Sequence, residues 1–360
     1  MNRLLAAFAL LAILSCTSKT PVPEDKILQA YAPPFFEDSV TLKRIESAIP
    51  AVEKIYREFA AERKFPSLSF GIVAGGKLIY AGKGGHSDRE ADKPMTDDTI
   101  FRIYSMTKPI TSLAAMMLYE EGKFDLNDPA GKWIDSLKES RVYVSGAPNN
   151  PVTRPATEPV RIWHLLSHMS GLTYGFTYMH NVDAIYRLKG YDWGAPKGST
   201  LASAVDDWCT SPLVFNPGEA WNYSYATDVL GRLIEIWSGQ SLDQFFAERI
   251  FSPLKMYDTA FWASEEHHER VAQLYVPVKG EAVAFGDLGK GAFHKPGWFS
   301  GGGGLVSTTR DYLRIVRLLA NGGAVDGVRV VRVNDLELAC SSVVSEQSGA
   351  GGIQWLCLHV

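Results

Sequence analysis

The chain has 360 residues, of which 21% are charged, and its formal net charge is −4. This length allows one large domain or two closely packed lobes. The charge is nearly balanced and no basic block stands out, so nothing in the composition favours a nucleic-acid partner. The three cysteines after Cys16 stand far apart, at Cys209, Cys340 and Cys357, and form neither a disulfide framework nor a Cys-x-x-Cys metal site.

Residues 1–16 predict a bacterial lipoprotein signal sequence. Arg3 supplies the charged start, and the apolar stretch after it is too short to cross a membrane as a helix. The sequence Ile-Leu-Ser-Cys that ends at Cys16 resembles a lipobox, so we expect lipidation of that cysteine and a lipid anchor in the cell envelope. Ordinary secretory cleavage nearby, which would leave a periplasmic protein, is the alternative. We then expect a tether and lead-in segment at 17–40, followed by one globular domain at 41–332.

The first elements predicted after the tether are a helix and a β-hairpin. Apolar residues recur at helical spacing over 52–63, which predicts an amphipathic helix. Residues 68–74 and 77–82 alternate in polarity on either side of Gly75-Gly76, and this pattern predicts two strands joined by a two-residue turn.

The next pattern is Ser-Met-Thr-Lys at 105–108, directly ahead of a run with apolar residues at helical spacing. That run closes at Gly122, so the spacing predicts a helix with Ser105 at its N-cap and Lys108 one turn on. Residues three apart share a helix face, so we expect the lysine amine within reach of the serine hydroxyl. The positive end of the helix dipole favours an alkoxide or oxyanion there, and a desolvated lysine can accept the serine proton. An ordinary N-capped amphipathic helix is the alternative for this motif by itself.

The rest of the chain indicates a mixed architecture. The middle is helical, broken by a polar, proline-bearing loop at 145–159, and 313–319 forms another helix. Strands at the start, helices in the middle and further strands expected at the end indicate an α+β fold. This fold would be an antiparallel sheet flanked by helices, with an inserted all-helical lobe at about 105–300. Catalytic sites commonly lie between two such lobes.

Several stretches resemble, in the right order, the penicillin-recognising serine hydrolase superfamily. The resemblance runs from about residue 66 to about residue 323 and is carried by residues 101–129, 160–172, 216–231, 250–256 and 301–311. It implies a β-lactamase/transpeptidase-like fold and an acyl-enzyme on Ser105. It also makes Tyr223 the third catalytic residue, because a phenol beside the Lys108 ammonium can shuttle a proton between the serine and the leaving group. A core aromatic residue near a helix start is the alternative for this tyrosine.

Within the superfamily, the Ser-Met-Thr-Lys sequence and a tyrosine motif without asparagine resemble the family VIII carboxylesterases more than the class C β-lactamases. Tyr225 stands where a β-lactamase usually has an asparagine whose amide helps hold a β-lactam side chain. The resemblance therefore implies short-chain esters as substrates and inefficient lactam turnover. We assign Tyr225 to substrate binding, together with Trp298, Phe299, Gly301 and Gly302. An aromatic core and a simple glycine turn are the alternatives for the last four.

One departure from the family concerns the carboxyl-terminal end. Family members carry a third motif, Lys-Thr-Gly, His-x-Gly or Trp-x-Gly, on a strand that lines the site and donates a backbone N–H to the oxyanion hole. No Lys-Thr-Gly follows the glycine run at 301–304, and no Lys or Arg occurs after Arg332. We therefore expect 333–360 to be an atypical tail and the chain to be truncated or frame-shifted, with sheet strands missing and catalysis impaired. A divergent end is the alternative.

Other chemistries find less support. His164 and His168 stand four residues apart, but no HExxH glutamate or third ligand accompanies them, so we expect structural roles and no metal. The glycine run lacks the Gly-Lys-Ser/Thr of a phosphate loop, and no Gly-x-Ser-x-Gly elbow occurs. We interpret the chain as a serine hydrolase without a cofactor, a carboxylesterase acting on a small-molecule ester. A β-lactamase or D-Ala-D-Ala peptidase is the alternative within this mechanism, and a non-catalytic envelope lipoprotein is the alternative outside it.

Overall fold

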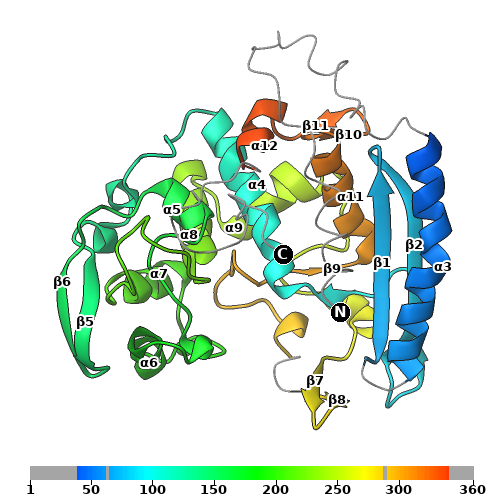
Figure 1. Cartoon of the computed structure of the whole chain (residues 1–360), viewed down its shortest axis with the longest axis horizontal. Helices are drawn as coiled ribbons and strands as arrows, with labels where there is room; N and C mark the ends of the chain where they lie inside the picture. Colours follow the sequence, from blue (N-terminus) through cyan, green and yellow to red (C-terminus); the bar gives the residue numbers. More distant parts are fainter. Residues whose placement is uncertain (1–38, 62–64, 287–289, 340–360) are drawn as a thin grey trace.

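The computed structural model describes residues 39–61, 65–286 and 290–339 (Figure 1). The expected signal sequence with Cys16, nearly all of the tether and the tail beyond residue 339 lie outside these ranges. The interpretations that concern them therefore stay predictions.

An antiparallel sheet of three strands forms one side of the molecule. Its order is β1 (Ser67–Ala74), β2 (Lys77–Asp88) and β3 (Lys93–Pro94). Gly75 and Gly76 connect the first two strands with φ values of 54° and 68°. A tight two-residue turn needs these left-handed values, and glycine adopts them without a steric penalty. The predicted hairpin is confirmed, although β2 continues beyond the predicted end at residue 82.

Two helices flank this sheet, α3 (Ser39–Ala61) and α11 (Thr309–Ala320). Figure 1 shows them on opposite sides of β1, and both pack against that strand. α3 begins well before the helix predicted at residue 52, and the chain stays helical through Pro50. α11 confirms the helix predicted near its residues, and the Thr308 hydroxyl caps it by accepting the Asp311 N–H at 3.2 Å.

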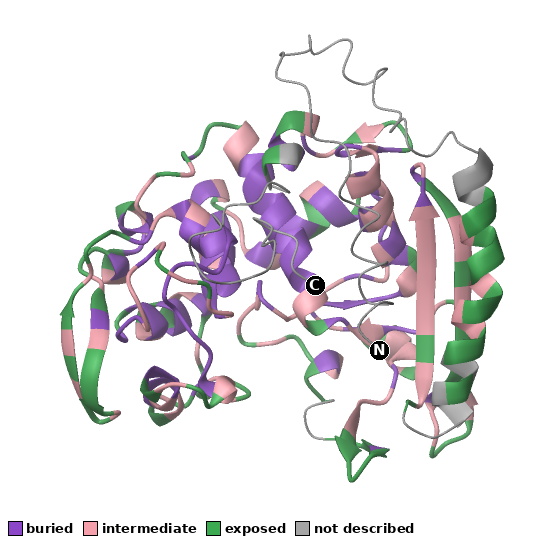
Figure 2. Cartoon of the chain, in the orientation of Figure 1, coloured by how far each residue is buried: buried purple, intermediate pink, exposed green. Residues whose placement is uncertain are grey.

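The core of the molecule is built around α4 (Thr107–Glu120), in which every residue from the first through Leu118 is buried (Figure 2). α8 (Ala226–Ser238) packs against it. α4 ends at Glu120, and Gly122, two residues further on, holds a φ of 71° that stops the helix. Further α-helices of the described ranges are α5 (Ile162–Leu166), α6 (Asn181–Leu188), α7 (Leu201–Cys209), α9 (Leu242–Phe246) and α12 (Val333–Ala339). No helix within the described ranges combines the length and the apolar character needed to cross a membrane.

The loop predicted at 145–159 is wrong for most of its length, because the chain forms a β-hairpin there. β5 (Arg141–Ala147) pairs with β6 (Asn150–Pro155) in antiparallel register. The strands are exposed on both faces for most of their length, so the sequence lacks the alternation that would mark a half-buried strand. Pro151 and Pro155 are tolerated because a two-stranded ribbon has only edge strands, where an N–H can be spared.

The lobe predicted as all-helical carries a second hairpin as well. β7 (Tyr275–Val278) pairs with β8 (Glu281–Ala284). Towards the end of the described chain, β10 (Ala324–Val325) pairs with β11 (Val328–Arg329). The α+β architecture of a helix-flanked antiparallel sheet with a largely helical lobe is confirmed.

A short ladder joins two segments that are far apart in the sequence. β4 (Phe101–Arg102) pairs with β9 (Val306–Ser307), and the Ile103 N–H continues the ladder by donating to the Leu305 carbonyl at 3.0 Å. This pairing brings the glycine run at 301–304 beside the start of α4.

We predict that Ile110→Ala lowers the free energy of unfolding by about 2–5 kcal/mol, because Ile110 is 0% exposed in α4 and its removal leaves a cavity. Urea unfolding followed by circular dichroism measures this loss. Met179→Ala is the matched control, since Met179 is 89% exposed and should change stability by no more than about 0.5 kcal/mol. Equal losses in the two variants would contradict the central position of α4.

Candidate active site

Ser105 lies in a single 3-10 turn, Tyr104–Met106, directly ahead of α4. The prediction that it caps the helix is wrong: α4 begins at Thr107, its N-cap is Met106, and no side chain caps it. Tyr104 holds a φ of 43°, an uncommon value for a residue other than glycine, and it turns the chain sharply before the serine. The Ser105 hydroxyl is therefore not used in capping and stays available to other side chains.

Lys108 stands in the first turn of α4 and is only 3% exposed. Its amine donates to the Ser105 hydroxyl at 3.3 Å and to the Gly302 carbonyl at 2.6 Å. It also lies 4.6 Å from the ring centre of Tyr223 and 5.6 Å from that of Tyr174. Aromatic faces attract a cation, so the buried amine is surrounded by groups that favour a positive charge.

Tyr223 completes the cluster from the segment just before α8. Its phenol hydrogen-bonds to the Ser105 hydroxyl at 2.6 Å. Its ring is held by Tyr174 at 5.3 Å, by His168 at 5.0 Å and by Trp221, which stacks on it at 6.2 Å between centroids. The structure thus brings together the three residues predicted to be catalytic.

The Ser105 amide provides a further polar group at this point. Its N–H donates to no carbonyl of the described chain, whereas the next amide, that of Met106, donates to Ile103 at 2.9 Å. An amide without a protein acceptor beside a nucleophilic hydroxyl can stabilise an oxyanion. The start of α4 adds the positive end of a helix dipole to the same place.

The glycine run contacts the cluster through its backbone. Gly301 and Gly302 are buried, and their carbonyls accept from Thr111 at 2.7 Å and from Lys108 at 2.6 Å. The Gly302 N–H donates to the Asp228 carboxylate at 3.0 Å. These contacts make the two glycines a scaffold that holds the lysine, and their assignment to substrate binding stays a prediction.

Asp228 is the residue of this site that the sequence did not reveal. It is 1% exposed in the first turn of α8, and its Oδ1 accepts from the Ser300 hydroxyl at 2.5 Å and from the Gly302 N–H. The signal was a single acidic residue inside an otherwise apolar stretch, Val229 and Leu230 following it directly. Such a residue needs buried partners, and this requirement could have marked it.

The aromatic residues assigned to substrate binding lie mainly in the packing around the site. Tyr225 is 7% exposed, with its ring stacked on Trp208 at 4.0 Å and edge-on to Tyr174 at 4.3 Å. Trp298 contacts Trp208 edge-on at 5.7 Å, and Phe299 contacts Phe261 at 5.0 Å. Trp298 and Phe299 are half-buried, so part of each ring reaches the surface.

The two histidines have separate structural roles. His164 is buried, and its Nδ1 accepts the Arg161 N–H at 2.9 Å, while His168 lies 3.3 Å from the Ser224 hydroxyl. Burial and the nearby Arg161 charge lower the pKa of His164 to about 4, so its ring is neutral near pH 7. Within 39–61, 65–286 and 290–339, no cluster of three or more His, Cys, Asp or Glu side chains is placed to hold a metal ion.

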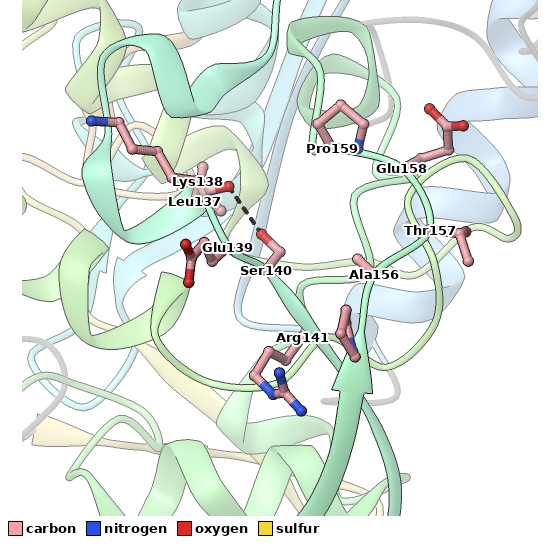
Figure 3. A pocket seen from close by; sticks show the side chains of 10 residues that line it. Leu137, Lys138, Glu139, Ser140, Arg141, Ala156, Thr157, Glu158 and Pro159 are labelled. Atoms are coloured by element: carbon pink, nitrogen blue, oxygen red, sulfur yellow. Dashed lines mark hydrogen bonds between the residues drawn. The ribbon is translucent and has the colours of Figure 1, made fainter.

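A cavity of about 420 Å³ lies where the β5–β6 hairpin meets the helical lobe (Figure 3). It is lined by Leu137, Lys138, Glu139, Ser140, Arg141, Pro155, Ala156, Thr157, Glu158 and Pro159. None of the residues clustered around Ser105 is among them, so this cavity is not part of the candidate active site.

Comparison of the sequence with known proteins identifies a family and several relatives. The Beta-lactamase family model matches residues 52–342. Esterase EstB of Burkholderia gladioli is 31% identical over 291 residues, which cover 76% of this chain and 70% of EstB. A protein of Mycobacterium tuberculosis is 38% identical over 262 residues, or 73% of this chain, and the matched part spans only 64% of that relative.

A solved structure gives the same result for the fold. The structure of EstCE1, a hydrolase with promiscuous acyltransferase activity, superposes with a TM-score of 0.73 at 25% identity. The match covers 88% of this chain and 83% of EstCE1. The predicted β-lactamase/transpeptidase-like fold is confirmed.

The low pKa of His164 predicts a pH dependence of stability. The folded chain keeps this ring neutral down to about pH 4, whereas the unfolded chain protonates it near the ordinary pKa of 6.5. Its contribution is therefore complete above pH 6.5 and is lost as the pH falls from 6.5 towards 4, by at most about 1.4 kcal/mol per pH unit. The free energy of unfolding, measured with urea at pH 7, 6 and 5, should fall less steeply with decreasing pH in His164→Gln than in the unmodified protein. Parallel declines would show that the ring is protonated in the folded state.

Proposed function

Because the chain belongs to the Beta-lactamase family of serine hydrolases, we propose that it hydrolyses short-chain carboxylic esters through an acyl-enzyme at Ser105. One observation carries the proposal: the Ser105 hydroxyl lies 2.6 Å from the Tyr223 phenol and 3.3 Å from the Lys108 amine. A serine hydroxyl becomes an effective nucleophile when an adjacent base takes its proton. Either neighbour can serve as that base in its deprotonated form, the tyrosine as a phenolate or the lysine as a neutral amine.

The reaction follows from these contacts in two steps. Ser105 Oγ attacks the ester carbonyl carbon while its proton passes to the pair formed by Tyr223 and Lys108, and the carbonyl oxygen becomes an oxyanion against the Ser105 amide. The intermediate collapses, the C–O bond to the alcohol breaks, and the alcohol leaves with the proton held by the pair. Water then attacks the acyl carbon, gives a proton to the same pair, and releases the carboxylic acid as the serine regains its proton.

The named relatives support chemistry on acyl groups. EstB is called an esterase, and EstCE1 is called a hydrolase with promiscuous acyltransferase activity. Hydrolysis and acyl transfer differ only in whether water or an alcohol receives the acyl group, so both fit one nucleophilic serine. The short acyl chain is inferred from the resemblance to the family VIII carboxylesterases, and the choice of an ester over a lactam is inferred from Tyr225.

Tyr225 favours an ester over a β-lactam as the substrate. The position that resembles the amide-bearing asparagine of β-lactamases holds a phenol here, and its ring is buried against Trp208 and Tyr174. No side-chain amide is supplied at this position for the side chain of a β-lactam. A β-lactamase or a D-Ala-D-Ala peptidase, which would use the same serine, is the second candidate.

We predict that the protein hydrolyses p-nitrophenyl butyrate faster than p-nitrophenyl palmitate. Its kcat/KM for nitrocefin should be lower than that for the butyrate by a factor of about 10² or more, because a site without the polar partner discriminates against the lactam. Steady-state absorbance assays measure all three rates. Nitrocefin turnover equal to butyrate turnover would favour the β-lactamase candidate.

Ser105→Ala should abolish both the butyrate activity and the mass adduct formed with a fluorophosphonate. Ser112→Ala is the matched control, since Ser112 is also buried in α4, at 4% exposure, and its side chain forms no hydrogen bond with Ser105, Lys108 or Tyr223. A labelled serine without turnover of any ester or lactam would indicate the non-catalytic alternative. Labelling that persists in Ser105→Ala would place the nucleophile elsewhere.

A further inference from the structure

The Asp228 carboxylate is buried near the proposed nucleophile without an ion-pair partner in the described chain. It is 1% exposed, and no lysine or arginine of the described ranges forms a salt bridge with it. Its Oδ1 accepts two hydrogen bonds, from Ser300 at 2.5 Å and from the Gly302 N–H at 3.0 Å. A buried carboxylate is costly unless it is hydrogen-bonded or its charge is balanced, so its presence calls for a physical reason.

Gly302 connects this carboxylate to Lys108. Its N–H donates to Asp228, and its carbonyl accepts from the Lys108 amine at 2.6 Å. A single glycine residue is thus fixed from both sides, by α8 through its N–H and by α4 through its carbonyl. The same amine reaches Ser105 at 3.3 Å, so the carboxylate is two hydrogen bonds away from the lysine and three from the nucleophile.

The approach of Asp228 requires glycine at position 302. A Cβ placed there would lie 2.3 Å from Asp228 Oδ2 and 3.0 Å from its Cγ, which is closer than real Cβ atoms pack. The neighbouring Gly301 also has no room for a side chain, since a Cβ there would lie 2.9 Å from the Thr227 carbonyl oxygen. Two adjacent glycines therefore let the turn close onto the start of α8.

The charges around Asp228 act in both directions. The pKa of this carboxyl is raised, because burial outweighs the Lys108 charge and the hydrogen bonds from Ser300 and Gly302, which lower it. The titratable groups that face it are Lys108 from α4 and the phenols of Tyr174 and Tyr225. Burial and then the Asp228 charge raise the pKa of both phenols. Because burial disfavours its charge, the Asp228 carboxyl depends on the hydrogen bonds that Ser300 and Gly302 donate to it.

We propose that Asp228 is a positioning residue, which fixes Gly302 so that its carbonyl aims the Lys108 amine at Ser105. The proposal rests on the function proposed above, because it assigns Asp228 a role in preparing the same serine.

The test is the rate at which a fluorophosphonate labels Ser105 between pH 5 and pH 10, followed by intact-mass spectrometry. This readout needs no knowledge of the natural substrate. Asp228→Ala removes the acceptor for Ser300 and Gly302, so labelling should slow by about 10-fold or more. Asp228→Asn keeps an acceptor for both groups and should restore most of the rate.

Asp311→Ala is the matched control for burial. Asp311 is also 1% exposed, stands in the first turn of a helix, and accepts two hydrogen bonds on one oxygen, from the Asp258 N–H at 2.8 Å and from Thr259 at 3.1 Å. Its replacement should lower the melting temperature as much as Asp228→Ala does and leave the labelling rate unchanged. A labelling rate of Asp228→Ala equal to that of the unmodified protein would overturn the proposal.

Gly302→Ala tests the same role from the other side of the contact and does not depend on the stability of Asp228→Ala. The new methyl group would meet the Asp228 carboxylate, so the turn or that carboxylate must move while the three proposed catalytic side chains remain. Labelling should slow by about 10-fold or more. Unchanged labelling would overturn the positioning role. An unmodified protein that is not labelled at all would instead refute the proposed function.

Discussion

Burial of the Lys108 amine is the constraint on which the rest of the site depends. An ammonium removed from water costs several kcal/mol unless acceptors replace its hydration. At 3% exposure these acceptors must come from the protein, and they are the Gly302 carbonyl, the Ser105 hydroxyl and the ring faces of Tyr223 and Tyr174. Each comes from a different segment, so the buried lysine is satisfied only when the whole fold has assembled around α4.

Two features of the fold bring these segments together. The β4–β9 ladder places the glycine run beside the start of α4, although Lys108 and Gly302 are 194 residues apart in the sequence. The packing of α8 on α4 brings Tyr223 and Asp228 to the same point from the other side. The left-handed residue Tyr104 costs about 1–3 kcal/mol in backbone strain, and that strain presents the serine hydroxyl to the phenol and the amine.

Local patterns in the sequence predicted the features that depend on near neighbours along the chain. The turn at Gly75-Gly76 and the pairing of Ser105 with Lys108 are of this kind, because backbone conformation and a three-residue spacing determine them. The β5–β6 hairpin was missed because its exposed strands carry no alternation of polarity. Asp228 and the burial of Tyr225 depend on contacts with segments distant in the sequence, and residues on either side of them do not reveal those contacts.

Whether Lys108 and Tyr223 act as one proton-transfer unit can be measured with Lys108→Ala, Tyr223→Phe and the double variant in a single ester assay. Each single change should lower kcat by about 10²–10⁴, the contribution of a positioned acid or base. The double variant should be little slower than the slower single variant, because groups that act as a unit are strongly non-additive. Losses that multiply in the double variant would show two independent contributions, and near-full activity of Tyr223→Phe would leave the lysine as the sole base.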